Sequence, residues 1–235
     1  MNGKNILIVG YGFVGKAVAA AFPDQNRLIV DPNVKGENTP SITFFNSSRE
    51  LNIQPHDIDA IFICVPTPMK SDGSMDERIL FSVLTDLLIL LRRTDDLNSS
   101  INTTTTYAPI ILKSTVLPSE FSRIQEEFGA LYDQIVYNPE FLTERNAFDD
   151  MINADLLVLG GDEMLCRDVE DLYVKDSICR VQNVHYMTRE EASFVKYGIN
   201  SFLASKLIWF NEFTHLIKSF DDDRTPGNKP DHKPG

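Results

Sequence analysis

The segment Asn5-Ile-Leu-Ile-Val-Gly10-Tyr-Gly12-Phe-Val-Gly15 opens the chain, and Arg27-Leu-Ile-Val-Asp31 follows it after a short helical stretch. An apolar strand, three glycines spaced as G-x-G-x-x-G, a helix and a second strand ending in Asp form the pattern of a dinucleotide-binding βαβ unit. Gly10 permits the tight turn, Gly12 lets the backbone approach a pyrophosphate, and Gly15 lets the helix pack closely on the sheet. The pattern therefore predicts a dinucleotide site near the start of the chain.

The same unit indicates which dinucleotide binds. The first-turn amides of the predicted helix, those of Phe13 and Val14 among them, lack partners within the helix, and the helix dipole favours an anion there. At the end of the second strand, the carboxylate of Asp31 can accept hydrogen bonds from both ribose hydroxyls but would repel a 2′-phosphate. We therefore expect the cofactor to be NAD rather than NADP.

Length and composition limit the other classes of function. With 235 residues, 43% of them hydrophobic, the chain can bury a substantial core, and its formal charge of −12 argues against a nucleic-acid surface. The longest apolar stretch, Ile79–Leu91, contains a charged residue and is too short to span a bilayer, and no signal peptide is recognisable. The three cysteines, Cys64, Cys166 and Cys179, show neither metal-ligand spacing nor an even count. We expect a cytoplasmic protein without a bound metal, a membrane segment or a nucleic-acid partner.

Apolar strand-like runs alternate with helical runs, which is typical of a parallel sheet covered on both faces. We expect an α/β fold with a Rossmann-like doubly wound parallel sheet over residues 1–187. A long helix of a small helical dimerisation region should follow at 188–220, and a disordered tail at 221–235. The polar segment Thr94–Tyr107 is predicted to be a surface loop. The predicted strands are Ile6–Val9, Leu28–Val30, Ile42–Phe45, Ala60–Val65, Ile110–Lys113, Ile135–Tyr137 and Leu156–Leu159, and the predicted domain helices are Val14–Ala21, Asp76–Arg92, Ser119–Phe128 and Glu163–Lys175.

The long helix has a clear start and one apolar side. Thr188 is suited to cap its N-terminus, with Glu190 and Glu191 in the first turn. A helix of roughly 30 residues is about 45 Å long, which exceeds what one such domain can cover. Apolar residues form a stripe along this helix, and the stripe predicts core packing or a helix–helix seam, and hence a homodimer. Its apolar residues, at three- and four-residue steps, are Ala192, Val195, Ile199, Phe202, Phe210, Phe213 and Ile217.

Two short segments follow predicted strands at the edge where doubly wound sheets bind ligands. We expect Val65, Pro66, Thr67, Ser114 and Thr115 to contact the cofactor, with Thr115 near the nicotinamide because its hydroxyl can donate and accept. For the prolines, a role as rigid turns explains the sequence equally well.

Lys196 and Asn200 stand four residues apart on the long helix and share one face. An ammonium and an amide side by side suit a pocket that stabilises negative charge on oxygen. The alternative is a solvated lysine next to a helix-weakening asparagine.

Five ordered segments, taken with the opening fingerprint, resemble the UDP-glucose/GDP-mannose dehydrogenase family. They are Cys64-Val-Pro-Thr-Pro68, Lys113-Ser-Thr-Val-Leu-Pro118, Asn138-Pro-Glu-Phe-Leu-Thr-Glu144, Lys196-x-x-x-Asn200 and Asn211-Glu212. The resemblance extends to about residue 218 and implies an NAD-dependent sugar-nucleotide 6-dehydrogenase. It also implies roles for individual residues: Glu144 in proton transfer or in positioning a water, Lys196 and Asn200 at the oxyanion, and Glu140, Phe141 and Leu142, with Lys196 and Asn200, along the sugar nucleotide. We count Thr115, from the position of its hydroxyl, with the catalytic residues.

Departures from the family pattern are equally informative. The sequence contains neither the Gly-rich Cys-x-Pro-Lys-Asp segment, whose thiol serves the second oxidation, nor the second nucleotide-binding domain. Ser193 stands where the family usually has Glu, and Arg145 where many members have Gly. We therefore expect the cofactor domain and dimerisation helix of such an enzyme, ending before the thiol. Two alternatives are a β-hydroxyacid-type dehydrogenase that removes one hydride, and a non-catalytic NAD-binding or dimerisation module.

Overall fold

The computed structural model describes residues 3–34, 36–92 and 108–224. The chain divides into two compact units, Met1–Lys196 and Tyr197–Gly235. The predicted loop Thr94–Tyr107 and residues 225–235 of the predicted tail lie outside the described residues. The prediction of a disordered tail from residue 221 is wrong for residues 221–224, which continue the last helix.

The first unit is built on one eight-stranded sheet with the strand order β3-β2-β1-β4-β5-β6-β7-β8. Neighbouring strands are parallel except β6 and β7, which pair antiparallel through Tyr137 and Gly160. The order reverses direction between β1 and β4, which makes their carboxyl ends the switch point where such sheets bind ligands. The strands are β1 (Asn5–Val9), β2 (Asn26–Val30), β3 (Ile42–Phe45), β4 (Ala60–Ile63), β5 (Ile110–Leu112), β6 (Ile135–Tyr137), β7 (Leu156–Gly160) and β8 (Asn183–Met187).

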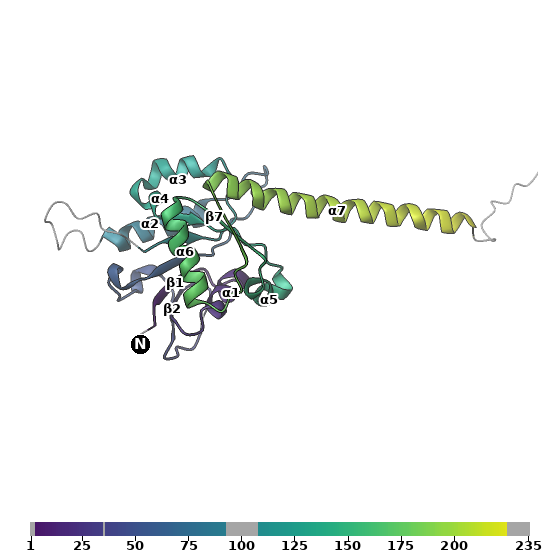
Figure 1. Ribbon diagram of the computed structural model, residues 1–235. Helices are drawn as coiled ribbons and strands as arrows, with labels where there is room; N and C mark the ends of the chain where they lie inside the picture. The colour runs from purple at the N-terminus through teal and green to yellow at the C-terminus, as the bar shows by residue number, and fades with distance from the viewer. Residues whose placement is uncertain (1–2, 35, 93–107, 225–235) are drawn as a thin grey trace, which may run out of the picture. The chain divides into compact units, whose positions relative to one another are not determined.

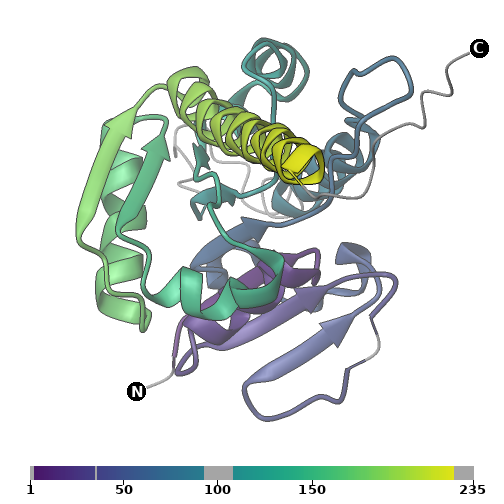
Figure 2. The same cartoon turned by 90° about the vertical axis from the view of Figure 1, so that its right-hand side faces the viewer.

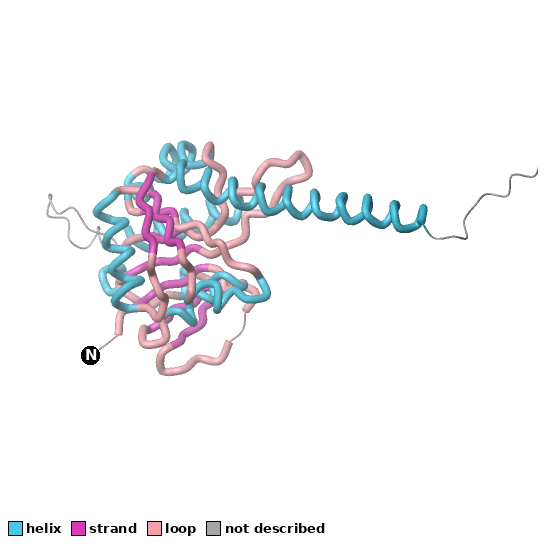
Figure 3. Tube along the Cα trace, turned by 45° about the vertical axis from the view of Figure 1, so that its right-hand side comes forward, coloured by secondary structure: helices cyan, strands magenta, loops and turns pink. Residues whose placement is uncertain are grey.

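Side chains of each central strand alternate between two apolar cores, one on each face of the sheet. In β1, Leu7 and Val9 face the core covered by α2 and α3, whereas Ile6 and Ile8 face the core covered by α1, α5 and α6. Figures 1 and 3 show the strands between these two groups of helices. This arrangement confirms the predicted doubly wound fold. The helices are α1 (Phe13–Ala21), α2 (Arg78–Arg92), α3 (Glu120–Phe128), α4 (Ala130–Asp133), α5 (Ala147–Ile152), α6 (Glu163–Asp176) and α7 (Arg189–Arg224).

The sequence prediction differs from the structure at several boundaries. Strand β4 ends at Ile63, so Cys64 and Val65 follow the strand instead of lying in it. Helix α2 begins at Arg78 because the carboxylate of Asp76 accepts the Arg78 N–H at 3.2 Å, ahead of the first turn. Strand β8 and the short helices α4 and α5 were not predicted. Figure 2 shows β8 at one end of the sheet, where an edge strand has few buried side chains to mark it.

Helix α7 starts in the first unit and continues into the second. Thr188 Oγ1 accepts the Glu191 N–H at 3.2 Å, and the Glu191 carboxylate accepts the Thr188 N–H at 2.8 Å, which is a reciprocal capping box. This confirms the predicted start. Ala192 is fully buried in the first unit, whereas large apolar side chains of the second unit, Trp209 and Phe210 among them, are exposed. Within the described ranges, none of the helices combines the length and apolar character that crossing a membrane requires.

Candidate functional site

The turn between β1 and α1 has the geometry that its glycines predict. Gly10 has a φ of +91°, and a Cβ added there would lie 2.7 Å from the carbonyl oxygen of Cys64. A Cβ on Gly15 would lie 2.0 Å from the carbonyl oxygen of Gly10, so only glycine allows the helix to pack this closely on the turn. A Cβ on Gly12 would meet no atom within 4 Å. The space over Gly12, ahead of the first-turn amides of α1, therefore fits a pyrophosphate.

Asp31 is held in place by two backbone amides. Its Oδ2 accepts the Tyr11 N–H and its Oδ1 accepts the Asn33 N–H, each at 2.8 Å. Each carboxylate oxygen keeps a further lone pair. The side chain is thus held in one orientation at the end of β2, and its role in accepting hydrogen bonds from ribose hydroxyls stays a prediction.

A cavity of about 560 Å³ lies beside Asp31 at the carboxyl ends of β1, β2 and β4. Val9, Gly10, Val65 and Pro66 line it, together with residues from the first turns of α2. The volume lies within the range typical of small-molecule and cofactor sites. The open space over Gly12, the oriented carboxylate and this cavity together fit the nucleoside half of NAD.

Two hydrogen bonds join the turns that follow β4 and β5. Ser114 Oγ donates to the Val65 carbonyl at 2.6 Å, and Thr67 Oγ1 donates to the Thr115 carbonyl at 2.6 Å. The predicted cofactor residues of these two motifs therefore lie side by side at the sheet edge. Thr115 itself is partly exposed there.

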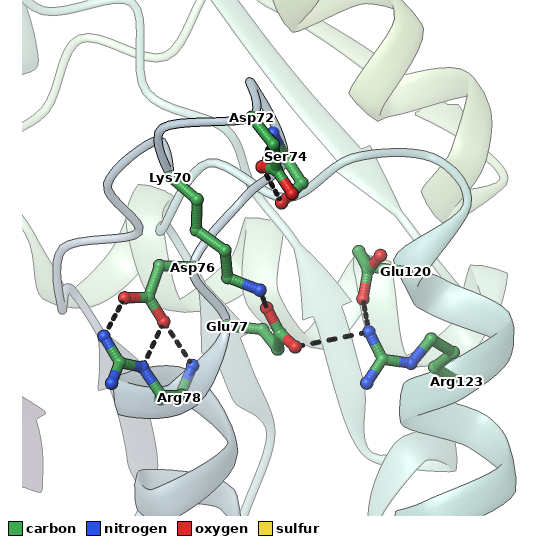
Figure 4. A network of polar contacts seen from close by, with 8 residues as sticks. All are labelled: Lys70, Asp72, Ser74, Asp76, Glu77, Arg78, Glu120 and Arg123. Carbon is green, nitrogen blue, oxygen red and sulfur yellow. Dashed lines mark hydrogen bonds and ion pairs between the residues drawn. The ribbon is translucent and has the colours of Figure 1, made fainter.

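A chain of charged groups ties the loop after Thr67 to helix α3 (Figure 4). Lys70 Nζ lies 2.9 Å from Glu77, and the other oxygen of Glu77 lies 3.6 Å from Arg123 Nη1. Arg123 also pairs with Glu120 at 2.7 Å. Because Lys70 and Arg123 are exposed, solvent screens these pairs, and they contribute little to the stability of the loop.

Lys196 and the segment after β6 form a compact polar cluster. The Lys196 side chain is only 5% exposed, and its Nζ lies 3.2 Å from Glu140 Oε1 while also donating to the Glu140 carbonyl oxygen. It lies 5.4 Å from the centre of the Phe141 ring. The second carboxylate oxygen of Glu140 accepts the Leu142 N–H at 2.8 Å. The structure thus brings together four of the predicted substrate residues.

Sequence reasoning assigned no role to three buried polar residues in the same region. Lys113 Nζ donates to Asn138 Oδ1 at 2.9 Å and to its carbonyl oxygen at 3.3 Å, and Ser193 Oγ donates to the Val116 carbonyl at 2.6 Å. Ser193 therefore holds the start of α7 on the turn after β5. The only signal in the sequence was the position of Lys113 and Asn138 within the quoted motifs, because their partners lie far away along the chain.

Other predicted residues lie outside this cluster. Glu144 is exposed at the start of the short 3₁₀ helix Glu144–Asn146, and Asn200 is exposed in the second unit. Their roles stay predictions. Burial raises the pKa of the Cys64 thiol to about 12 and that of Cys166 to about 11, and it also raises the pKa of Cys179. All three cysteines are therefore protonated, weak nucleophiles near neutral pH.

The strand order, the glycine turn and the oriented Asp31 define a Rossmann-like, dinucleotide-binding domain of the dehydrogenase class. Residues 36–175 match the "UDP-glucose/GDP-mannose dehydrogenase family, NAD binding domain". The chain belongs to this family, and its cofactor is NAD.

Individual relatives agree with this assignment. UDP-glucose 6-dehydrogenase AglM of Haloferax volcanii is 28% identical over 92% of this chain and 55% of its own length. The UDP-glucose 6-dehydrogenase of Campylobacter jejuni is 29% identical over 88% of this chain and 54% of its own length. This chain therefore spans about half the length of the curated relatives it matches.

Solved structures show the same fold. A UDP-glucose dehydrogenase from Pyrobaculum islandicum has a TM-score of 0.69 at 26% identity, covering 90% of this chain and 52% of the other. A GDP-mannose dehydrogenase from Pseudomonas aeruginosa, crystallised as a ternary complex, has a TM-score of 0.70 at 20% identity, with the same coverage.

Proposed function

We propose that this chain is the NAD-binding half of a sugar-nucleotide 6-dehydrogenase, which oxidises a primary alcohol of its substrate by hydride transfer to NAD. The observation that carries the proposal is the buried Lys196 ammonium held against Glu140. Burying an ammonium without a partner costs free energy. The Lys196 ammonium is instead paired with Glu140 at the edge of the sheet where ligands bind, which indicates that its charge serves the function of the site.

In this proposal, Lys196 stabilises the alkoxide from which hydride leaves. An ammonium has three N–H groups, and two of them point to oxygens of Glu140, so the third serves a substrate oxygen. Phe141 and Leu142 contribute the apolar surface along the sugar. The hydroxyl of Thr115 orients the reacting groups near the nicotinamide, and Asn200 adds an amide donor one turn beyond Lys196. Glu144 accepts the proton of the substrate hydroxyl, directly or through a water.

NAD supplies the chemistry of hydride acceptance, and the chain supplies binding and orientation. Gly12 and the first-turn amides of α1 bind the pyrophosphate, and Asp31 binds the ribose. UDP-glucose is the sugar nucleotide that the names of the relatives favour. A homodimer formed through α7 is part of the proposal, because the second unit exposes many large apolar side chains.

An assay of substrate class tests the proposal. Purified chain and NAD are mixed with UDP-glucose, GDP-mannose or a short 3-hydroxyacid, each with and without a full-length relative, and NADH is followed by absorbance. By itself the chain should form NADH at a negligible rate. In the mixtures with the relative, we expect NADH above the amount that the relative makes alone only with a sugar nucleotide, and a smaller increment with Lys196→Met. An increment with the hydroxyacid alone would favour a β-hydroxyacid-type dehydrogenase. NAD binding with no increment in any mixture would favour a non-catalytic module.

A further inference from the structure

Lys113 is a buried cation for which the proposed reaction has no role. It follows β5 directly, its exposed fraction is 4%, and its ammonium donates only to the two Asn138 oxygens among the hydrogen bonds of the described residues. Asn138 is itself fixed, because its Nδ2 donates to the Val158 carbonyl at 2.9 Å and its Oδ1 accepts the Tyr173 hydroxyl at 2.9 Å. The ammonium therefore sits in a rigid cage of neutral groups.

The ionisable groups around Lys113 leave its charge uncompensated. Burial is the main influence on the pKa of Lys113 and lowers it. Cys64, Glu140 and Cys179 act to raise this pKa, and Lys196 acts to lower it. The raised pKa values of both cysteines keep the thiols neutral near pH 7. Glu140 is paired with Lys196. Two ammonium groups and one carboxylate give the cluster a net positive charge.

The position of this charge relative to the cofactor follows from the sheet. In the proposed binding mode, the adenosine end lies beside Asp31, in the cavity at the carboxyl ends of β1 and β2. A dinucleotide crosses a doubly wound sheet at the switch point between β1 and β4, so the nicotinamide end extends over the turns after β4 and β5. Lys113 directly precedes the second of these turns, Ser114–Thr115, and its buried ammonium contacts Asn138, which follows the neighbouring strand β6.

We propose that Lys113 is a buried fixed charge that favours the reduced form of the bound cofactor. The nicotinamide ring of NAD⁺ is positively charged and that of NADH is neutral, so a nearby cation in a poorly solvated region weakens binding of the oxidised form selectively. The same charge makes bound NAD⁺ a stronger hydride acceptor. The inference rests on NAD binding and does not depend on the identity of the substrate.

Calorimetric dissociation constants for NAD⁺ and NADH test the proposal without turnover. The quantity of interest is the ratio of the NAD⁺ constant to the NADH constant. We expect Lys113→Met to lower this ratio by about threefold or more. Tyr173 still donates to Asn138 in this variant, and methionine fills a similar volume. The matched control, Lys70→Met, removes an exposed cation from the loop after Thr67 and should leave the ratio unchanged.

Two results would overturn the proposal. A folded Lys113→Met variant with an unchanged ratio would show that the charge does not act on the nicotinamide, and equal losses of both affinities would indicate only a structural role. If the variant does not fold, the unmodified chain still decides the matter. It must bind NADH more tightly than NAD⁺, and equal affinities, or tighter binding of NAD⁺, would exclude the assigned effect.

Discussion

Gly12 and Gly15 stand one helical turn apart, yet a side chain would meet opposite surroundings at the two positions. Gly12 has φ −70° and ψ −161°, a backbone conformation open to any residue, and a Cβ there meets no protein atom within 4 Å. At Gly15 a Cβ would overlap the Gly10 carbonyl oxygen. We therefore expect the first glycine to serve the ligand, whereas the second serves the fold.

A pair of valine variants separates these roles. We expect Gly12→Val to reduce NAD affinity at least a hundredfold, which is about 2.7 kcal/mol, while leaving the melting temperature within a few degrees of the parent. Gly15→Val should lower the melting temperature strongly or prevent folding, because the backbone must move to admit the side chain. Calorimetric titration and thermal unfolding measure the two effects. Tight NAD binding by Gly12→Val would contradict the placement of the pyrophosphate.

Cys64 makes stability sensitive to alkali. Burial raises the pKa of its thiol from 9.0 to about 12. Between these values the folded chain keeps a proton that the unfolded chain releases, so the free energy of unfolding falls as the pH rises. The contribution is complete below about pH 9 and is lost as the pH approaches 12. We expect Cys64→Ala to show a shallower fall between pH 9 and pH 11 in urea unfolding.

Cys166→Ala is the matched control for this prediction. The pKa of Cys166 is raised to about 11, so its substitution should change the slope less than that of Cys64. Burial lowers the pKa of Lys113, which acts in the opposite direction in the alkaline range. Lys113 and Cys64 influence each other's pKa, so the change in slope for Cys64→Ala includes the response of Lys113. A slope for Cys64→Ala equal to that of the parent would show that the thiol titrates normally.

Site residues could be predicted from the sequence where a local pattern sets their geometry. The glycine turn and Asp31 were predictable because their spacing within one βαβ unit determines their geometry. The contact between Lys196 and Glu140 joins residues far apart in the chain, and no local pattern shows that the carboxylate faces the ammonium. The same holds for Lys113 and Asn138. Only tertiary packing sets these distances.

At the scale of elements, burial on both faces made the central strands easy to predict. Strands β1, β4 and β5 are continuous apolar runs, as expected for parallel strands between two layers of helices. Strand β8, Asn-Val-His-Tyr-Met, is only partly buried and alternates polar and apolar residues, so its pattern was weak. Helices α4 and α5 are too short for a period of 3.6 residues to stand out.

The sequence of helix α7 is explained less well by its surroundings within one chain than that of any other described element. In the second unit its exposed large apolar residues recur at three- and four-residue steps. The rings of Trp209 and Phe213, two of these exposed residues, stack with their centres 5.2 Å apart and form one continuous surface. Such a surface is typical of a helix that packs against another chain.

We therefore expect a homodimer at micromolar concentration, measured by light scattering coupled to size exclusion. Ile217→Asp, in the apolar stripe, should shift the population to monomer, because a carboxylate would be buried without a partner. His215→Asp changes charge on the opposite side of the same helix and should leave the dimer intact. A clean monomer for the unmodified chain would refute the prediction, and dissociation by both variants would indicate a general effect of charge.

At the scale of the whole molecule, the chain carries the parts that bind and orient NAD, and it spans about half the length of its relatives. Its three cysteines are protonated near neutral pH and lie outside the Cys-x-Pro-Lys-Asp pattern. A second oxidation, from aldehyde to carboxylate, needs a nucleophile that converts the aldehyde carbon into a tetrahedral hydride donor. The first oxidation needs only NAD, a base and donors to the oxyanion.

We expect these 235 residues, tested by themselves with NAD and UDP-glucose, to bind NAD but to form NADH at a negligible rate. Binding energy from remote parts of a substrate positions the reacting carbon. The residues that the structure describes contain one Rossmann-like sheet, whose site NAD takes, so they offer the nucleotide end of the substrate no comparable site. The measurement is NADH absorbance together with the amount of sugar consumed. Two NADH per sugar would contradict the expectation and would mean that a thiol acts despite its raised pKa. Single substitutions of Cys64, Cys166 and Cys179 by Ser would then identify it, because only the nucleophile's loss would reduce the yield to one NADH.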